Sequence, residues 1–405
     1  MLTKPLNQIE RADIDALVTN QICEGTSLEF KREPIAQNEE VARDVAAMAN
    51  GGGGDIILGV SESNGVAQSV TPFANGDAEA NRVVSIVLAG VSPRLVIGTQ
   101  VVTRPGGDVV VVRVGRARIP AMVHLGNRTD FWERRDRQKV RMTHAEIVSR
   151  IREGLVETQR RDEFIQQRVY RFRTRSEATG TLVGFFLSVT PETLSESEIV
   201  SIRDAGIHRI MSDPSRIRDT LVIEATPQPT LEGLRSMRRE FPGYGFEIHR
   251  NGHIELQLHN AREHLAGTTD TVVWDPRGPG GQKIEVRTVL AGGIIARNVI
   301  ETIGRAKRVY DLSGMFEQFV VTLALVNAGG SLLPGRIIPK EEGAIVEEPG
   351  TLWTESVLVV QAPGFPGEAE GVTAKRLCDL FWQAFGRWGC RAIDEQGRLT
   401  AEPPR

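Results

Sequence analysis

The chain has 405 residues, of which 40% are hydrophobic and 25% charged, values that are ordinary for a folded protein of two or three domains. Its formal net charge of −3 excludes a strongly basic chain, so a nucleic-acid site must be a local patch. The sparse, odd set of cysteines (Cys23, Cys378 and Cys390) argues against a disulfide framework and predicts a cytoplasmic location. No apolar run is long enough for a membrane span, so we expect no membrane partner.

The first 155 residues contain short periodic segments separated by turn residues. Helical spacing of apolar residues predicts helices at 8–20, 38–50, 78–88 and 145–175. Alternating or β-branched segments predict strands at 28–31, 55–60, 95–102, 108–114 and 131–133. Asn38 is the expected N-cap of the second helix, and Asn50 and Gly51 are its expected C-terminal cap. The two strands on either side of residues 104–107 are expected to form a hairpin.

Residues 156–405 predict a second, mixed α/β domain of unknown role. Helices are expected at 231–240, 286–310 and 374–388, and strands at 181–189, 246–249, 253–259, 316–326 and 356–361. One face of the strand at 253–259 carries His253, Glu255, Gln257 and His259. We expect this face to be solvated, because His253 and His259 would lie about 20 Å apart and one ion cannot contact both.

The stretch over residues 24–60 resembles the Schlafen-type AlbA-like domain. It contains LEFK in the first strand, a helix that ends in AMAN, a glycine turn, and an apolar strand that ends in Gly59-Val60. Two later segments, FWER at 131–134 and MTHAEI at 142–147, are similar to that family's closing strand and helix. The resemblance covers about residues 1–155. It implies an α+β protein in which an N-terminal mixed sheet with packed helices is followed by a C-terminal mixed α/β domain.

The resemblance also implies a function. The family is implicated in binding nucleic acid, and some members are metal-dependent endoribonucleases. Bacterial members are often described only as DNA-binding or ATP-binding. We therefore expect a nucleic-acid-binding protein of the bacterial cytoplasm, with a role in regulation or defence. Whether the ligand is DNA or RNA stays open, as does self-association into a homo-oligomer.

Acidic residues at the first strand suggest a second hypothesis, a nuclease. Glu24 and Glu29 are five residues apart, and Lys31 shares the face of Glu29. Paired carboxylates can hold Mg²⁺ or Mn²⁺, which would activate water for RNA cleavage. The resemblance matches both glutamates to metal ligands, but the place of the third acid holds Ser61, with Glu62 beside it. In this hypothesis Glu24, Glu29 and Lys31 are catalytic, and Glu62 is the third metal ligand. The alternative is a structural ion pair between Glu29 and Lys31.

The glycine run at 51–54 suggests a third hypothesis, an ATP-binding interaction module. Glycines let backbone amides approach a phosphate closely. The run lacks the GK[S/T] sequence of a Walker A loop, and it follows a helix instead of preceding one. A tight turn between helix and strand is therefore favoured over nucleotide binding.

The leading hypothesis depends on a basic stretch. Residues 128–175 contain 14 Lys and Arg against 8 Asp and Glu. Basic side chains bind phosphates, and an aromatic ring can stack on a base. The expected nucleic-acid-binding residues are Trp132, Arg134, Arg135, Arg137, Lys139 and Arg141. The alternative is an exposed arginine face that pairs with its own acidic neighbours.

Overall fold

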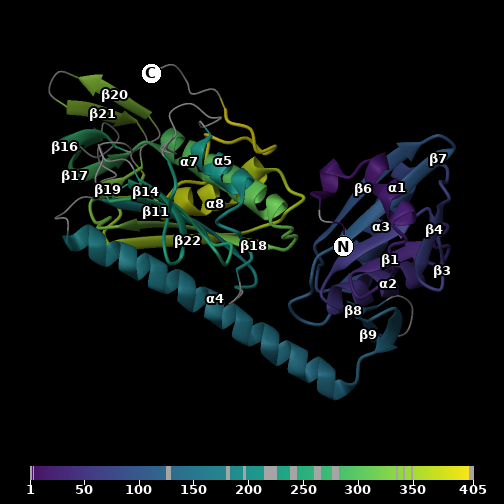
Figure 1. Ribbon diagram of the computed structural model, residues 1–405. Coiled ribbons are helices and arrows are strands. Elements are labelled where there is room, and N and C mark those ends of the chain that lie inside the picture. Colours follow the sequence, from purple (N-terminus) through teal and green to yellow (C-terminus); the bar gives the residue numbers. More distant parts are fainter. Residues whose placement is uncertain are drawn as a thin grey trace. The chain divides into compact units, whose positions relative to one another are not determined.

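The computed structural model describes residues 2, 4–124, 129–178, 183–194, 198–213, 226–237, 244–259, 266–275, 282–333, 336–340, 343–347 and 350–400. The chain forms two compact units (Figure 1). Unit 1 is Met1–Gln159 with Gly314–Glu317, and unit 2 is Arg160–Ser313 with Gln318–Arg405. Each unit combines helices with sheets, so the predicted α+β class is confirmed. The expected functional boundary at residue 155 stays a prediction.

A four-stranded mixed sheet forms the centre of unit 1. Its strands, in spatial order, are β1 (Leu28–Lys31), β2 (Gly54–Leu58), β7 (Gly107–Val114) and β6 (Ile97–Arg104). β1 and β2 are parallel, and the other pairs are antiparallel. The crossover between the parallel strands is α2 (Asn38–Asn50). The strand–helix–strand unit and the β6–β7 hairpin are therefore as the sequence predicted.

Helices cover both faces of this sheet. α2 and α3 (Gly76–Gly90) share one apolar cluster with β2 and β7. α1 (Arg11–Thr19) packs with β1, β6 and β7 on the other face. Ala42, Ala46 and Ala49 of α2 are buried, and their small side chains let the helix lie close to the strands. α2 begins at Asn38, and Gln37 occupies the cap position without a side-chain cap bond, so the N-cap expected at Asn38 is wrong.

The remaining strands of unit 1 form two small sheets. One contains β10 (Gln138–Arg141), β9 (Asp130–Arg135), β8 (Met122–Val123) and β5 (Val91–Ser92) in that order. The other is the hairpin of β3 (Val60–Ser63) and β4 (Val66–Val70). β9 also packs against α2. The first part of the predicted basic stretch therefore lies on the β9–β10 hairpin, which packs against α2.

Unit 2 is built on an antiparallel seven-stranded sheet and a second, five-stranded sheet. The first contains β12 (Gln228–Pro229), β13 (Gly233–Met237), β14 (Tyr244–His249), β15 (Ile254–Leu258), β11 (Gly184–Pro191), β18 (Phe319–Val326) and β22 (Val357–Gly364). The second contains β19 (Ser331–Leu332), β17 (Gln282–Leu290), β16 (Ala266–Asp275), β21 (Gly343–Glu347) and β20 (Arg336–Lys340).

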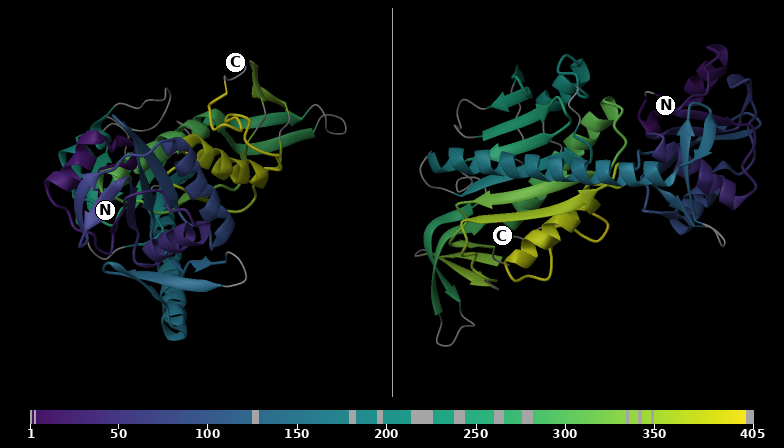
Figure 2. Two further views of the ribbon diagram at one scale, coloured as in Figure 1. Left: turned by 90° about the vertical axis from the view of Figure 1, so that its right-hand side faces the viewer. Right: turned by 90° about the horizontal axis from the view of Figure 1, so that it is seen from below.

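Helices lie against both faces of the seven-stranded sheet (Figures 1 and 2). The C-terminal half of α4 (His144–Ala178) packs Ile165, Val169 and Phe172 against Phe186 on one face. On the other lie α7 (Gly292–Leu312) and α8 (Glu370–Ala384), with α5 (Ala205–Ser212) packed on α7. No helix within the described ranges is both long and apolar enough to cross a bilayer.

Three predictions for the second half are wrong. Residues 233–237 form strand β13 where a helix was expected over 231–240, of which 238–240 lie outside the described residues. The helix expected from residue 286 begins only at Gly292, because β17 continues to Leu290. The polar face of β15 is buried, since α4 covers it, and His253 and Glu255 are 0% exposed.

We expect Ala46→Leu to destabilise unit 1 by about 1–3 kcal/mol, because a fully buried alanine at the helix–sheet contact leaves no space for three added carbons. Urea unfolding followed by circular dichroism would measure the change. Ala78→Leu, at an exposed position of α3, is the matched control and should leave the free energy of unfolding within about 0.5 kcal/mol. Equal effects of the two substitutions would mean that α2 does not pack through this face.

Candidate nucleic-acid interface

Beneath the β9–β10 hairpin, unit 1 contains a buried cluster of charged side chains. Glu29 accepts from Lys31 Nζ at 2.7 Å through Oε1 and from Arg134 Nη1 at 2.7 Å through Oε2. Lys31 Nζ also lies 3.2 Å from Asp44 Oδ2, and Lys139 pairs with the other oxygen of Asp44. Strand β1, helix α2 and both strands of the hairpin are therefore joined by one ion-pair network.

The electrostatics of this network follow from burial. Burial, and then the nearby charge of Asp44, raise the pKa of Glu29 although Lys31 and Arg134 act to lower it. Burial alone would lower the pKa of Lys31, but Asp44 and Glu29 raise it above its ordinary value. Removing one partner would leave a buried charge uncompensated, which is far more costly than losing an exposed ion pair.

Arg134 lies inside the domain. Its residue is 3% exposed, and besides Glu29 it donates to the carbonyl oxygens of Gly25, at 2.8 Å from Nε, and of Leu28, at 3.3 Å from Nη2. Its guanidinium thus fastens β9 to the turn that precedes β1. In this arrangement Arg134 positions the hairpin and has no face open to a phosphate.

The three glutamates of the nuclease hypothesis have separate backbone or side-chain partners. Glu24 Oε1 accepts from Phe30 N at 2.7 Å, and Glu62 Oε2 accepts from Gly65 N at 2.5 Å. Ser61 Oγ lies 2.7 Å from Ser69 Oγ across the β3–β4 hairpin. A metal site needs at least three ligand atoms close together. Among the described residues, Glu24, Glu29 and Glu62 do not belong to any group of three or more such side chains whose ligand atoms lie within 4.8 Å of one another. Their roles in catalysis or metal binding stay predictions.

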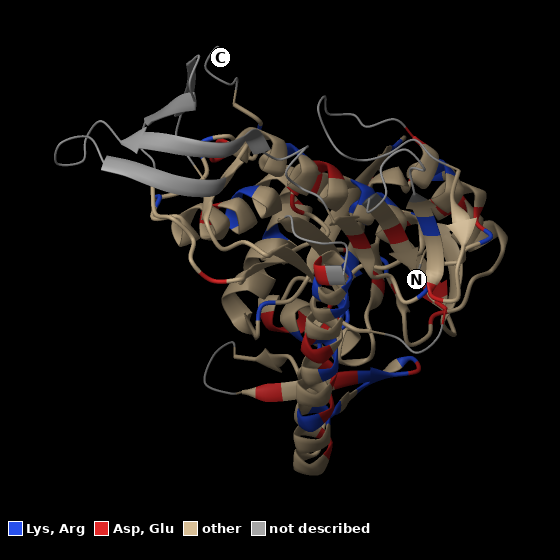
Figure 3. Cartoon of the chain, turned by 90° about the vertical axis from the view of Figure 1, so that its left-hand side faces the viewer, with Lys and Arg blue, Asp and Glu red and all other residues tan. Residues whose placement is uncertain are grey.

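Three arginines of the hairpin are exposed: Arg135 at the end of β9, Arg137 in the turn and Arg141 at the end of β10. The side chains of Arg135, Arg137 and Arg141 are 48%, 49% and 57% exposed. Arg135 bonds Glu133 and Glu146, and Arg137 donates to the carbonyl oxygen of Asn64. Figure 3 shows that basic and acidic residues are also interspersed along α4. Arg128, at the start of the basic stretch, lies outside the described residues.

Trp132 lies between two arginines. The guanidinium carbons of Arg43 and Arg141 are 5.4 Å and 5.0 Å from the centre of its ring, distances typical of cation–π contacts. The ring packs on the core cluster of unit 1, and within the described part of the chain its buried Nε1 has no hydrogen-bond partner. The sequence did not identify Arg43 as a neighbour of Trp132, because the basic stretch begins 85 residues later. Its spacing from Glu39 predicts only an ion pair along the helix, which the structure contains.

Helix α2 ends at Asn50 with Gly51 in the C-cap position, as expected, and Asn50 has a further role. It is buried, its Nδ2 donates to the carbonyl oxygens of Ala121 at 3.0 Å and Trp132 at 2.7 Å, and its Oδ1 accepts from Ala121 N at 2.7 Å. The residue that follows the helix, Gly51, has a φ of −78°, which is not the left-handed conformation of a glycine cap. Asn50 thus bonds the end of α2 to the backbone at Ala121 and at Trp132 of β9.

The glycine run serves as a close-packed turn. Gly53 has a φ of +86°, and a Cβ there would lie 2.8 Å from the carbonyl oxygen of Val114. A Cβ on Gly54 would overlap the backbone of Ser27. Side chains are therefore excluded at both positions by neighbouring backbone, which accounts for these glycines without a nucleotide.

A buried ion pair that the sequence did not reveal lies at the start of β2. Arg113 Nε donates to Asp55 Oδ1 at 2.8 Å, and both side chains are almost fully buried. Arg113 also donates to the carbonyl oxygens of Leu2 and Lys4, so the pair holds the N-terminal segment. Only the isolated aspartate in an otherwise apolar strand signalled this contact.

Comparison with known families agrees with this architecture. Residues 24–143 match the family described as Schlafen, AlbA_2. The N-terminal part of the chain is a Schlafen/AlbA-like domain. The matched residues include β1, α2, the glycine turn and the β9–β10 hairpin, so the resemblance predicted from the motifs is confirmed for this part of the chain.

Two solved structures are similar to parts of the chain. One is the N-terminal domain of a protein related to an ATP-dependent DNA helicase, RecG, from Nitrosomonas europaea; it is 24% identical, with 25% of this chain and 72% of that chain covered and a TM-score of 0.22. The other is the DIP2311 protein from Corynebacterium diphtheriae, 17% identical, with 35% and 28% covered and a TM-score of 0.25. Comparison with curated proteins gives no match.

We expect Arg134→Ala to destabilise the Schlafen/AlbA-like domain by about 3–5 kcal/mol, because it leaves the buried Glu29 carboxylate without its guanidinium partner. The exposed neighbour Arg135 provides the control, and Arg135→Ala should change stability by no more than about 0.5 kcal/mol. Chemical denaturation of the full chain would measure both. A small effect of Arg134→Ala would mean that the cluster does not hold the hairpin.

Proposed function

We propose that the Schlafen/AlbA-like domain binds nucleic acid through the outer surface of the β9–β10 hairpin. The observation that carries the proposal is the set of exposed guanidinium groups there, Arg135, Arg137 and Arg141, in a domain of a nucleic-acid-related family. A chain with a net charge of −3 needs such a local concentration of positive charge to approach a polyanion.

The buried cluster supports the proposal by making the surface rigid. Arg134 and Lys139 are paired across the two strands, and their charges are neutralised inside by Glu29 and Asp44. Arg135 follows Arg134 in β9 and points to the opposite face. A hairpin anchored in this way loses little conformational freedom when it binds, so more of each phosphate contact appears as affinity. Lys139 and Arg134 then act by positioning, and the outward arginines act by contact.

Trp132 contributes through its two arginines. Both contact the ring, so a cation–π interaction holds the guanidinium of Arg141 while its side chain stays exposed to solvent. We infer that the ring orients Arg141 toward a phosphate and becomes available to a base only when an arginine moves away. Whether DNA or RNA is preferred depends on contacts to the sugar and the bases, which a phosphate-binding surface alone does not select.

Reversal of the exposed arginines should weaken binding and reduce its salt dependence. For Arg135→Glu, Arg137→Glu and Arg141→Glu, each lost phosphate contact should lower the slope of log K against log salt by about 0.9 on duplex DNA and about 0.7 on single strands. Fluorescence anisotropy at several salt concentrations, with single-stranded, duplex and transfer RNA and duplex DNA, would measure the slopes.

The control for this series is Arg11→Glu, on α1, whose side chain is 58% exposed. It makes the same change of charge as each single reversal but on the opposite face of the central sheet, so it should leave the slope unchanged. Equal slopes for wild type and a variant that combines the three hairpin reversals would remove the hairpin from the proposal.

A metal-dependent endonuclease acting on RNA is the second candidate function. One observation favours it: Glu29 and Asp44 are neighbouring buried carboxylates on the same lysine, and the pKa of Glu29 is raised, as often occurs in functional sites. Mg²⁺ or Mn²⁺ prefers such anionic oxygen ligands. Against it, Lys31 and Arg134 already occupy both oxygens of Glu29.

The nuclease hypothesis makes a sharp prediction about two substitutions. If Glu29 holds a metal, Glu29→Gln should abolish Mn²⁺-dependent RNA cleavage while RNA binding persists, because the amide has no charge to hold a hard cation. Ser61→Asp should increase cleavage by restoring the third acid. Cleavage assays on labelled RNA with and without Mn²⁺ decide the matter: if wild type cleaves and Glu29→Gln cleaves equally well, the acidic residues are not an active site.

A further inference from the structure

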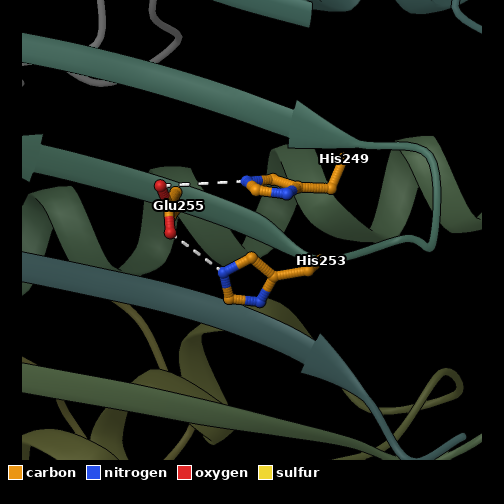
Figure 4. Close-up of side chains that lie close together, drawn as sticks. All are labelled: His249, His253 and Glu255. Carbon is orange, nitrogen blue, oxygen red and sulfur yellow. Dashed lines mark hydrogen bonds and ion pairs between the residues drawn. The ribbon is translucent and has the colours of Figure 1, made fainter. Parts of the chain in front are cut away.

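Unit 2 contains a buried group of two histidines and a glutamate that the nucleic-acid proposal does not use (Figure 4). The β14–β15 turn brings His249 back beside His253, with a backbone hydrogen bond of 2.8 Å from His249 N to His253 O and 4.9 Å between the ring centres. Glu255 Oε2 lies 3.0 Å from His253 Nε2, and its Oε1 lies 3.8 Å from His249 Nε2.

One atom of this group is left without a hydrogen bond. His249 is 4% exposed, and its buried Nε2 has no hydrogen-bond partner among the residues that the structure describes. The polar atoms that it faces are carboxylate oxygens, of Glu247 at 3.6 Å and of Glu255 at 3.8 Å, which are too far for hydrogen bonds. Buried polar atoms nearly always have a hydrogen-bond partner, so an imidazole nitrogen that faces only carboxylate oxygens beyond hydrogen-bond distance calls for an explanation.

We propose that His249, His253 and Glu255 bind a divalent transition metal of the zinc class. Zinc bonds to nitrogen and oxygen are about 2.0–2.1 Å long, so ligand atoms in a tetrahedral site lie about 3.3 Å apart. The separations from the histidine nitrogens to Glu255, 3.0 Å from His253 to Oε2 and 3.8 Å from His249 to Oε1, bracket this value. Two imidazoles with carboxylates are a ligand set typical of zinc and unlike the all-oxygen set of magnesium.

The ion can enter in place of a proton. A neutral imidazole carries one proton, on either Nδ1 or Nε2. With that proton on Nδ1, which lies 2.9 Å from Thr190 Oγ1, the Nε2 lone pair faces Glu255. The hydroxyl of Thr190 then fixes the tautomer of the ligand, as second partners of metal-bound histidines commonly do.

Arg168 of α4 is the competitor for the same carboxylate. It binds both oxygens of Glu255, with Nε 3.0 Å from Oε2, and Gln257 donates to Oε1 at 2.5 Å. A carboxylate has about four lone-pair positions, so these bonds leave the one that faces His253. The metal would lie between this lone pair of Glu255 and Nε2 of His253, and the bonds from Arg168 to Glu255 would stay in place.

The competing explanation is an ion-pair network without metal. Glu247 is paired with Arg235 at 2.9 Å, and Glu255 with Arg168, so the buried charges balance when both imidazoles are neutral. That network accounts for both carboxylates and leaves His249 Nε2 unsatisfied. Phe164, whose ring lies 4.9 Å from that of His253, adds an apolar cover over the group.

Metal binding to the full chain tests the proposal directly. After stripping with chelator and reloading, the wild type should retain one Zn²⁺ per chain through dialysis, measured by elemental analysis, and Zn²⁺ but not Mg²⁺ should raise its melting temperature. Co²⁺ should give visible absorption bands of a tetrahedral site. A thiolate charge-transfer band would instead place the ion on Cys378 or Cys390, and would overturn the assignment.

The matched variants are His249→Gln and His259→Gln. The first removes a proposed ligand and should weaken Zn²⁺ binding by more than about tenfold. The second changes a histidine just past the end of β15 that bonds Ser176 and lies outside the group, so its affinity should stay that of wild type. Equal loss in both variants, or a wild-type chain that retains no Zn²⁺ and melts unchanged, would leave the ion-pair network as the whole explanation. The wild-type measurement decides even if His249→Gln does not fold.

Discussion

The arrangement of the Schlafen/AlbA-like domain depends on the buried contact between Arg134 and Glu29. The two residues are 105 positions apart in the chain, and their pairing joins the closing hairpin to the first strand of the central sheet. A buried ion pair of this kind adds little net stability compared with an apolar contact, but it tolerates only one geometry. It therefore sets the position of β9, and with it the direction in which the alternate side chains of the hairpin point.

Sequence periodicity predicted the local elements of this domain well, because each depends on contacts near in sequence. The spacing of Val41, Val45 and Met48 reports the buried face of α2, and the β-branched run over residues 108–114 reports a buried strand. The strand–helix–strand order was then sufficient for the parallel pairing of β1 with β2. In unit 2 the same reasoning failed for a strand taken as a helix at β13, for the start of α7, and for a strand face that a distant helix covers.

The face of β15 is the clearest case of that failure. Its alternation of Ile254, Leu256 and Leu258 with polar residues is the pattern of a strand with one solvated face. In the structure α4 lies over the polar side and supplies Arg168 and Phe164 to it. The hairpin signal at residues 250–252 could have placed His249 beside His253, but only the helix that covers them makes the polar side chains a buried group. Burial by a distant element is not encoded in the period of the strand itself.

The same effect changes how a charge count is read. The run from 128 to 175 has an excess of basic residues, yet its arginines divide between two environments. Arg134 and Arg168 are buried against glutamates of strands, whereas Arg135, Arg137 and Arg141 face solvent. A guanidinium cannot give up its charge when buried, so each buried arginine requires a carboxylate nearby, and that carboxylate cancels it in the field outside. The electrostatic footprint of this protein is therefore set by the arginines that the fold leaves without a buried acid. Alternation in β9 turns Arg135 away from Arg134, whereas Arg137 is exposed because it lies in the turn of the hairpin. Arg141 shares the face of Arg134 and Lys139 and is exposed at the end of β10.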